Sequence, residues 1–127
     1  MSLFDSFKPF NFNEGVPYVS ITNNGMTFNK SVVMKLGYPS HVLLLINEDS
    51  KQIAVKKCSE LDHNSAPFFK PKKSNAISVR WNGRDLLNTI EGMMGWDLAK
   101  AGYKVDGTLI REEDAMLFDL THAIELS

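Results

Sequence analysis

The chain has 127 residues, 43% of them hydrophobic, and a formal net charge of −1. A chain of this length and composition can bury a core as one globular domain without disulfides or metal. Its longest apolar run, residues 42–46, is too short for a membrane helix. The single Cys58 excludes an internal disulfide, and residues 1–5 lack the basic region and apolar stretch of a signal peptide. We therefore expect a cytoplasmic protein with no membrane partner.

Residues 1–17 form an aromatic segment, in which four phenylalanines, including Phe7 and Phe10, surround one proline. Aromatic side chains at this density favour burial. We expect the segment to pack on the domain, and the alternative is that Phe7 and Phe10 bind a protein partner.

Residues 18–58 form a first half with the order strand, short helix, hairpin. An alternating run at 18–22 leads through the turn at 23–25 to Asn29, which can cap a helix over residues 30–36. Gly37 can end this helix in a left-handed conformation. The apolar run Val42–Ile46, apolar at successive positions, predicts a strand buried on both faces, and residues 51–57 return as its hairpin partner.

Residues 59–76 read as a linker loop with two prolines and little periodicity. Phe68 and Phe69 lie beside Lys70 in this loop, a combination that can stack nucleic-acid bases and contact phosphates. The alternative, which we favour, is that the two rings pin the loop onto the barrel while the lysines stay in water.

Residues 77–127 predict a second strand, helix and hairpin. The strand covers 77–81, the amphipathic helix covers 84–94 and ends at Gly95, and the hairpin pairs residues 103–110 with 115–120. The acidic turns after Ile46 and Ile110 look alike, but any acidic hairpin turn would give this likeness. A true internal duplication and a chance similarity both remain open.

The first half resembles the AbrB-like swapped-hairpin transcription factors. The matching residues are Gly25 to Lys30 at the entry, Lys35-Leu36-Gly37 at the helix end, Pro39-Ser40, and the hairpin of residues 43–55. Asn29 stands where the family usually has proline, and Met26 where it commonly has a basic residue. The resemblance implies a small β-barrel that binds duplex DNA, with Lys30 and Lys35 at the phosphates. If the second half is a repeat, Arg80 and Arg84 hold the corresponding positions, and one chain supplies both halves of a barrel that shorter members build as dimers.

Charge is distributed unevenly along the chain. Residues 1–84 carry eleven Lys or Arg against six Asp or Glu, whereas residues 85–127 carry three against nine. Such asymmetry can form a basic face for an anionic partner or promote self-association as a homodimer, and it is also compatible with ordinary solvated charge.

The spacing of chemically reactive residues does not indicate an enzyme. The three histidines have no metal-site spacing, Cys58 lacks a cysteine partner, and the acidic cluster 112–114 lies on a predicted turn in water. We expect no cofactor and no metal, although a ligand pocket inside the barrel needs no motif and stays open.

Together these patterns predict a mostly β protein with two short helices, a small barrel of swapped-hairpin type built from two similar halves. The leading functional hypothesis is a non-enzymatic AbrB-like DNA-binding regulator. The alternative is a protein-interaction or structural module that binds no nucleic acid.

Overall fold

A computed structural model describes residues 3–7, 15–71 and 77–126 of the protein. The strands are β1 (Tyr18–Thr22), β2 (Gly25–Phe28), β3 (His41–Asn47), β4 (Gln52–Cys58), β5 (Ala66–Pro67), β6 (Val79–Trp81), β7 (Gly102–Ile110), β8 (Ala115–Asp119) and β9 (Ile124–Leu126). The helices are α1 (Lys30–Lys35) and α2 (Arg84–Met94), with single 3-10 turns η1 (Arg111–Glu113) and η2 (Leu120–His122). The predicted mostly β fold with two short helices is confirmed.

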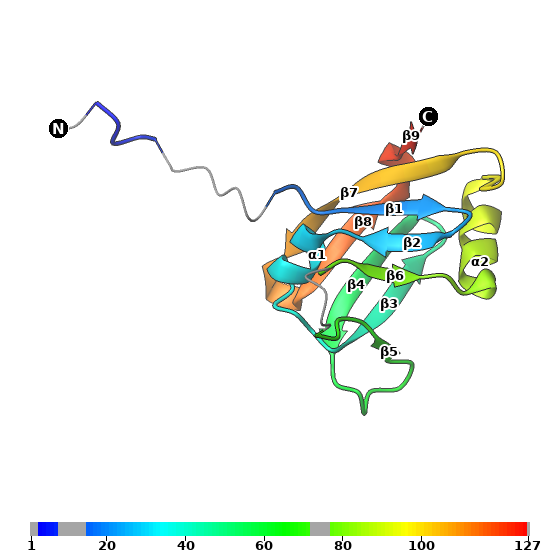
Figure 1. Ribbon diagram of the computed structural model, residues 1–127, viewed down its shortest axis with the longest axis horizontal. Helices are drawn as coiled ribbons and strands as arrows, with labels where there is room; N and C mark the ends of the chain where they lie inside the picture. Colours follow the sequence, from blue (N-terminus) through cyan, green and yellow to red (C-terminus); the bar gives the residue numbers. More distant parts are fainter. Residues whose placement is uncertain (1–2, 8–14, 72–76, 127) are drawn as a thin grey trace.

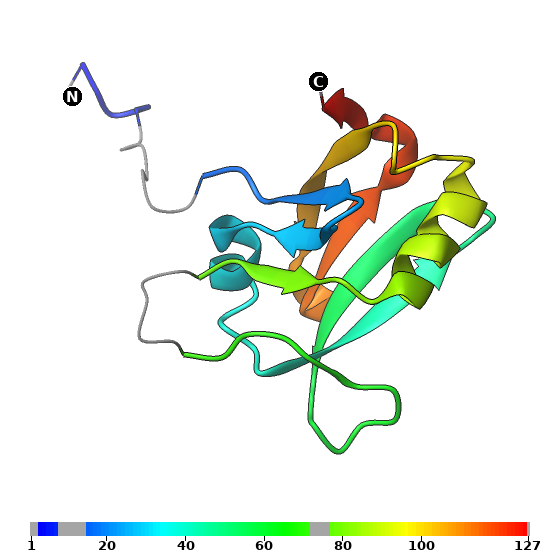
Figure 2. The same cartoon turned by 45° about the vertical axis from the view of Figure 1, so that its right-hand side comes forward.

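The strands form one antiparallel sheet that curls into a half-barrel (Figure 1). Its strand order is β5-β3-β4-β8-β7-β1-β2-β6, and β9 pairs with the beginning of β7. Figures 1 and 2 show α1 and α2 at opposite ends of the curled sheet. No helix in the described parts of the chain has the length and apolar character needed to cross a membrane.

Both segments, residues 18–58 and 77–127, have the expected order of strand, helix and hairpin, and strands of the two segments pair with each other. β2 pairs antiparallel with β6, β4 with β8, and β1 with β7. The linker contributes β5, which pairs with β3. Among the described residues, β6 ends the sheet without pairing to β5. The half-barrel is therefore open at the junction of β5 and β6, which we call the seam.

Local sequence signals fix both helix boundaries. The Asn29 side chain accepts a hydrogen bond from the Val32 amide at 3.2 Å, which satisfies a donor that the first turn leaves unpaired. The chain then leaves α1 through Gly37 at φ +81°. At the other helix, Gly95 takes the left-handed conformation at φ +71° and its amide bonds to the Glu91 carbonyl.

The core fills the concave side of the sheet. Its largest fully buried side chains include Phe28, Phe118, Met116, Ile21 and Leu87.

Gly25 is required where β2 meets β6. A Cβ atom there would lie 2.6 Å from the Trp81 carbonyl oxygen, and its φ of +138° disfavours any other residue. Gly25 thus lets β6 approach β2 closely.

Two burial expectations were wrong. Val42 is fully buried, but Leu45 and Ile46 are 45% and 37% exposed. Leu45 lies on the outer face of β3, which no described layer covers, and Ile46 lies on the inner face near the end of the strand, where the burial of β3 fades. In the aromatic segment, Phe4 and Phe7 are 63% and 67% exposed and contact each other edge to face, instead of packing in the core. Phe10 lies outside the described residues.

In the described part of the linker the aromatic rings contact the domain, whereas Lys72 and Lys73 lie outside the described residues. Phe68 is buried and packs edge to face on Phe28 and Trp81, while Phe69 contacts Tyr38 and Lys70 is exposed. The loop also contributes β5 to the edge of the sheet.

Candidate nucleic-acid interface

A row of polar side chains crosses the outer face of four neighbouring strands. Arg80 of β6 lies opposite Thr27 of β2, Thr27 opposite Ser20 of β1, and Ser20 opposite Lys104 of β7. Their neighbours along each strand, such as Val19, Phe28 and Val105, are buried, so strand alternation turns the row away from the core. The row places a cation at each end and two hydroxyl groups between them.

The cations at the ends of this row are held by neighbouring side chains. The Arg80 Nε donates to the Thr27 hydroxyl at 2.9 Å, which leaves its terminal amino groups for a ligand. The Lys104 ammonium lies 4.3 Å from the centre of the Tyr18 ring, a cation–π contact. Both contacts restrict long side chains that would otherwise lose conformational entropy on binding an anion.

Three cations also follow the direction of β2. Arg84 donates to the side-chain and backbone oxygens of Asn23 at 3.3 and 3.4 Å, at the turn before β2. Arg80 lies beside the middle of the strand, and Lys30 begins α1 directly after Asn29 at its end. At about 3.3 Å per residue in extended chain, this line is roughly 20 Å long. We call Lys30, Arg80 and Arg84 the basic track.

The basic track is not neutralised by neighbouring acids. Within the part of the chain that the structure describes, Lys30, Arg80 and Arg84 make no ion pair with a carboxylate. All three side chains belong to exposed residues. Their charge is therefore directed into solvent, where an anion can reach it.

The structure separates Lys35 from the other predicted phosphate contacts. Lys35 lies at the far end of α1, in a small hollow with Leu36, Leu109, Arg111 and Asp114. Of the predicted partner-binding residues, Phe7 is exposed and Phe10 lies outside the described residues.

The seam lies next to the basic track. Its two walls are residues 67–70 and 78–81, which enclose a cavity of about 290 Å³. Trp81 spans the seam, because its indole nitrogen donates to the Pro67 carbonyl oxygen at 3.1 Å. Arg80 belongs both to the track and to the lining of this cavity.

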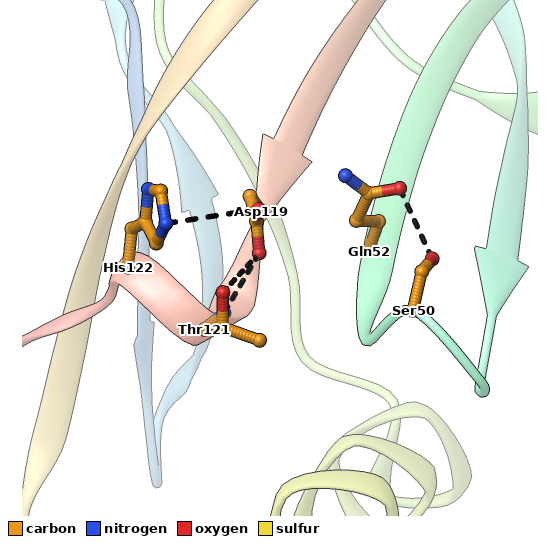
Figure 3. Close-up of polar contacts among 5 residues, drawn as sticks. All are labelled: Ser50, Gln52, Asp119, Thr121 and His122. Carbon is orange, nitrogen blue, oxygen red and sulfur yellow. Dashed lines mark hydrogen bonds and ion pairs between the residues drawn. The ribbon is translucent and has the colours of Figure 1, made fainter.

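A second polar cluster lies on β8 and η2 and has a structural role (Figure 3). The Asp119 carboxylate accepts from the Thr121 hydroxyl at 2.6 Å and from its amide at 3.0 Å, and these hydrogen bonds lower the Asp119 pKa. His122 lies 4.0 Å away on the same carboxylate. The lowered pKa makes Asp119 a weak base toward the Thr121 hydroxyl, and the carboxylate caps η2 through the Thr121 amide.

Among the residues that the structure describes, the remaining reactive groups show no catalytic arrangement. Desolvation and the nearby Asp62 charge raise the Cys58 pKa, which disfavours the reactive thiolate. The described part of the chain contains no group of three or more His, Cys, Asp or Glu side chains placed to hold a metal ion.

Of the four residues in the cross-strand row, sequence reasoning named only Arg80 as a site residue. Alternation in residues 18–22 places Tyr18 and Ser20 on one face, but only the pairing of β1 with β7 brings Lys104 beside them. That pairing joins residues more than eighty positions apart, and a local pattern does not contain it.

Comparison with known proteins gave no match to any protein-family model, curated protein or solved structure.

Proposed function

We propose that this protein is a non-enzymatic DNA-binding regulator of AbrB-like type that contacts phosphates through its basic track. The observation that carries this proposal is the line of three unpaired cations along β2, next to the cross-strand row. Successive phosphates of one DNA strand can follow such a line, and phosphate contacts supply most of the non-specific affinity of DNA-binding proteins.

Two sequence arguments, the second resting on the first, concern this surface. Lys30 comes from the motif that resembles the AbrB-like family, and Arg80 and Arg84 come from the proposed repeat of that motif. The antiparallel pairing of β2 with β6, which sets Arg80 opposite Thr27 two residues before Asn29, supports the proposal that both sets act together. Lys35, the other motif residue, lies at the far end of α1, away from the basic track. We therefore expect Lys35 to contribute less to DNA affinity than Lys30 does.

The test is a titration of fluorescently labelled duplex DNA at low salt, followed by anisotropy. We expect a dissociation constant in roughly the micromolar range at low salt. The double variant Lys30→Glu, Arg80→Glu should abolish this binding, while Lys30→Glu, Lys35→Glu should weaken it through Lys30.

The matched control is Lys57→Glu, an exposed lysine on β4 in the opposite wall of the half-barrel. This variant should bind nearly as the unmodified protein does. The proposal fails if duplex does not bind at low salt, or if the track variants and Lys57→Glu have the same effect.

One observation favours the second candidate, a protein-interaction module. Leu3, Phe4 and Phe7 are 83%, 63% and 67% exposed, an apolar cluster of the kind that binds a partner. This candidate predicts a protein complex that withstands nuclease and is lost in the double variant Phe7→Ser, Phe10→Ser. Recovery of nucleic acid alone would count against it.

A further inference from the structure

The lining of the seam combines aromatic side chains with exposed cations. Phe68 is buried, and Phe69 and Trp81 are half-buried, among the residues that line the cavity. Lys70 and Arg80 are both exposed at its lining. Tyr38, 44% exposed, contacts the Phe69 ring at a centroid distance of 5.2 Å and extends the aromatic surface outward.

The seam is open for a structural reason. In the first half, a tight turn at Asn23-Asn24 joins β1 to β2, so these strands pair along their length. β5 and β6, in contrast, are separated by residues 68–78, and among the described residues β6 has one unpaired edge. Trp81 bridges the junction through its side chain rather than its backbone. An aromatic cavity therefore lies where these two strands do not form a β-ladder.

We propose that the seam binds an unpaired base of a nucleic acid whose phosphates lie on the basic track, so that a single strand binds in preference to a fully paired duplex. This inference rests on the proposed function and specifies its ligand. A base offers a flat face of the kind that aromatic side chains stack on in single-strand-binding proteins.

The position of Arg80 connects the two sites. A nucleotide base is joined to its phosphate through one sugar, so a phosphate held by Arg80 brings its base within reach of the cavity that Arg80 lines. Lys70 on the opposite wall can contact the next phosphate. In a duplex the bases are paired and stacked inside the helix, and they cannot enter the seam without being extruded at an energetic cost.

The experiment uses the full chain with Trp96→Phe, which leaves Trp81 as the only tryptophan. Trp96 stacks on Tyr103 near the end of α2 and does not line the seam. Three ligands are titrated: a DNA strand of about 12 nucleotides, the same strand with its central bases replaced by abasic sites, and the fully paired duplex. Anisotropy reports affinity, and Trp81 emission reports stacking in the seam.

We expect the intact single strand to quench Trp81 and to bind more tightly than the duplex. The abasic strand keeps its phosphates, so it should bind roughly 5- to 150-fold more weakly and leave Trp81 unquenched. Phe69→Ala should weaken single-strand binding within the same range and leave duplex binding unchanged. The control Leu61→Ala, which shortens a 90% exposed apolar side chain outside the seam, should change neither.

Two results separate this inference from the proposed function. Equal affinity for the intact strand, the abasic strand and the duplex, with no change in Trp81 emission, would overturn base binding in the seam and leave the phosphate track standing. Absence of binding by all three ligands at low salt would overturn both. If Phe69→Ala does not fold, the comparison of intact and abasic strands on the otherwise unmodified seam still decides the question.

Discussion

Replacement of Gly25 by alanine should destabilise the protein and displace β6. The backbone there has a φ of +138°, which costs an ordinary residue about 1–3 kcal/mol. The new Cβ would also lie 2.6 Å from the Trp81 carbonyl oxygen, closer than real contacts allow. Because the obstacle is backbone, relief requires movement of the β6 strand. From the backbone strain and the clash together, we expect the free energy of unfolding to fall by about 2–4 kcal/mol.

The assay is equilibrium urea unfolding followed by tryptophan fluorescence and circular dichroism. Gly92→Ala is the matched control, because Gly92 lies inside α2 with open space around it and no positive φ. Alanine there should stabilise the protein by about 1 kcal/mol through helix propensity. The two substitutions should therefore move the unfolding midpoint in opposite directions. A Gly25→Ala protein as stable as the original would refute the account of how β2 and β6 meet.

Three further predictions concern stability. Asn29→Ala removes a side chain that bonds to Val32, Tyr18 and Val16, so denaturant unfolding should show a loss of about 1–2 kcal/mol; an unchanged midpoint would contradict the capping role. Phe118→Ala should cost about 3–5 kcal/mol by the same measurement, because the ring is fully buried. The Lys56 ammonium, by hydrogen bond and charge, lowers the Glu113 pKa. The stability that the Lys56–Glu113 interaction contributes is therefore fully present above the pKa of Glu113 in the unfolded chain, near 4.5. It is lost as the pH falls through the lower pKa of Glu113 in the folded protein. Thermal unfolding of Glu113→Gln should vary less with pH in that range than that of the original protein, and identical profiles would exclude this contribution.

The sequence predicted local elements well because their signals are local. Asn29 caps the start of α1, and Gly37 and Gly95 follow the ends of the two helices, as expected. The second hairpin, predicted at 103–110 and 115–120, lies at Gly102–Ile110 and Ala115–Asp119. The order of strand, helix and hairpin was correct in both halves.

Non-local pairing explains what the sequence could not predict. The apolar run Val42–Ile46 suggested burial on both faces, but which faces are covered depends on the neighbours of β3 in space. Likewise, Lys104 joins the candidate interface only through the pairing of β7 with β1. The seam lies where β5, a strand formed within the predicted linker, and β6 stay unpaired with each other among the described residues. Hydrophobic periodicity does not specify such a missing pair.

The salt dependence of duplex DNA binding tests the phosphate track most directly. Three contacts, from Lys30, Arg80 and Arg84, predict a slope of about −2.7 for the logarithm of the binding constant against the logarithm of salt concentration, and Arg80→Gln should reduce it to about −1.8. The corresponding loss of affinity between 50 and 200 mM salt is roughly 40-fold for the unmodified protein. A slope near zero, or one that Arg80→Gln leaves unchanged, would contradict the assignment of this face to nucleic-acid phosphates.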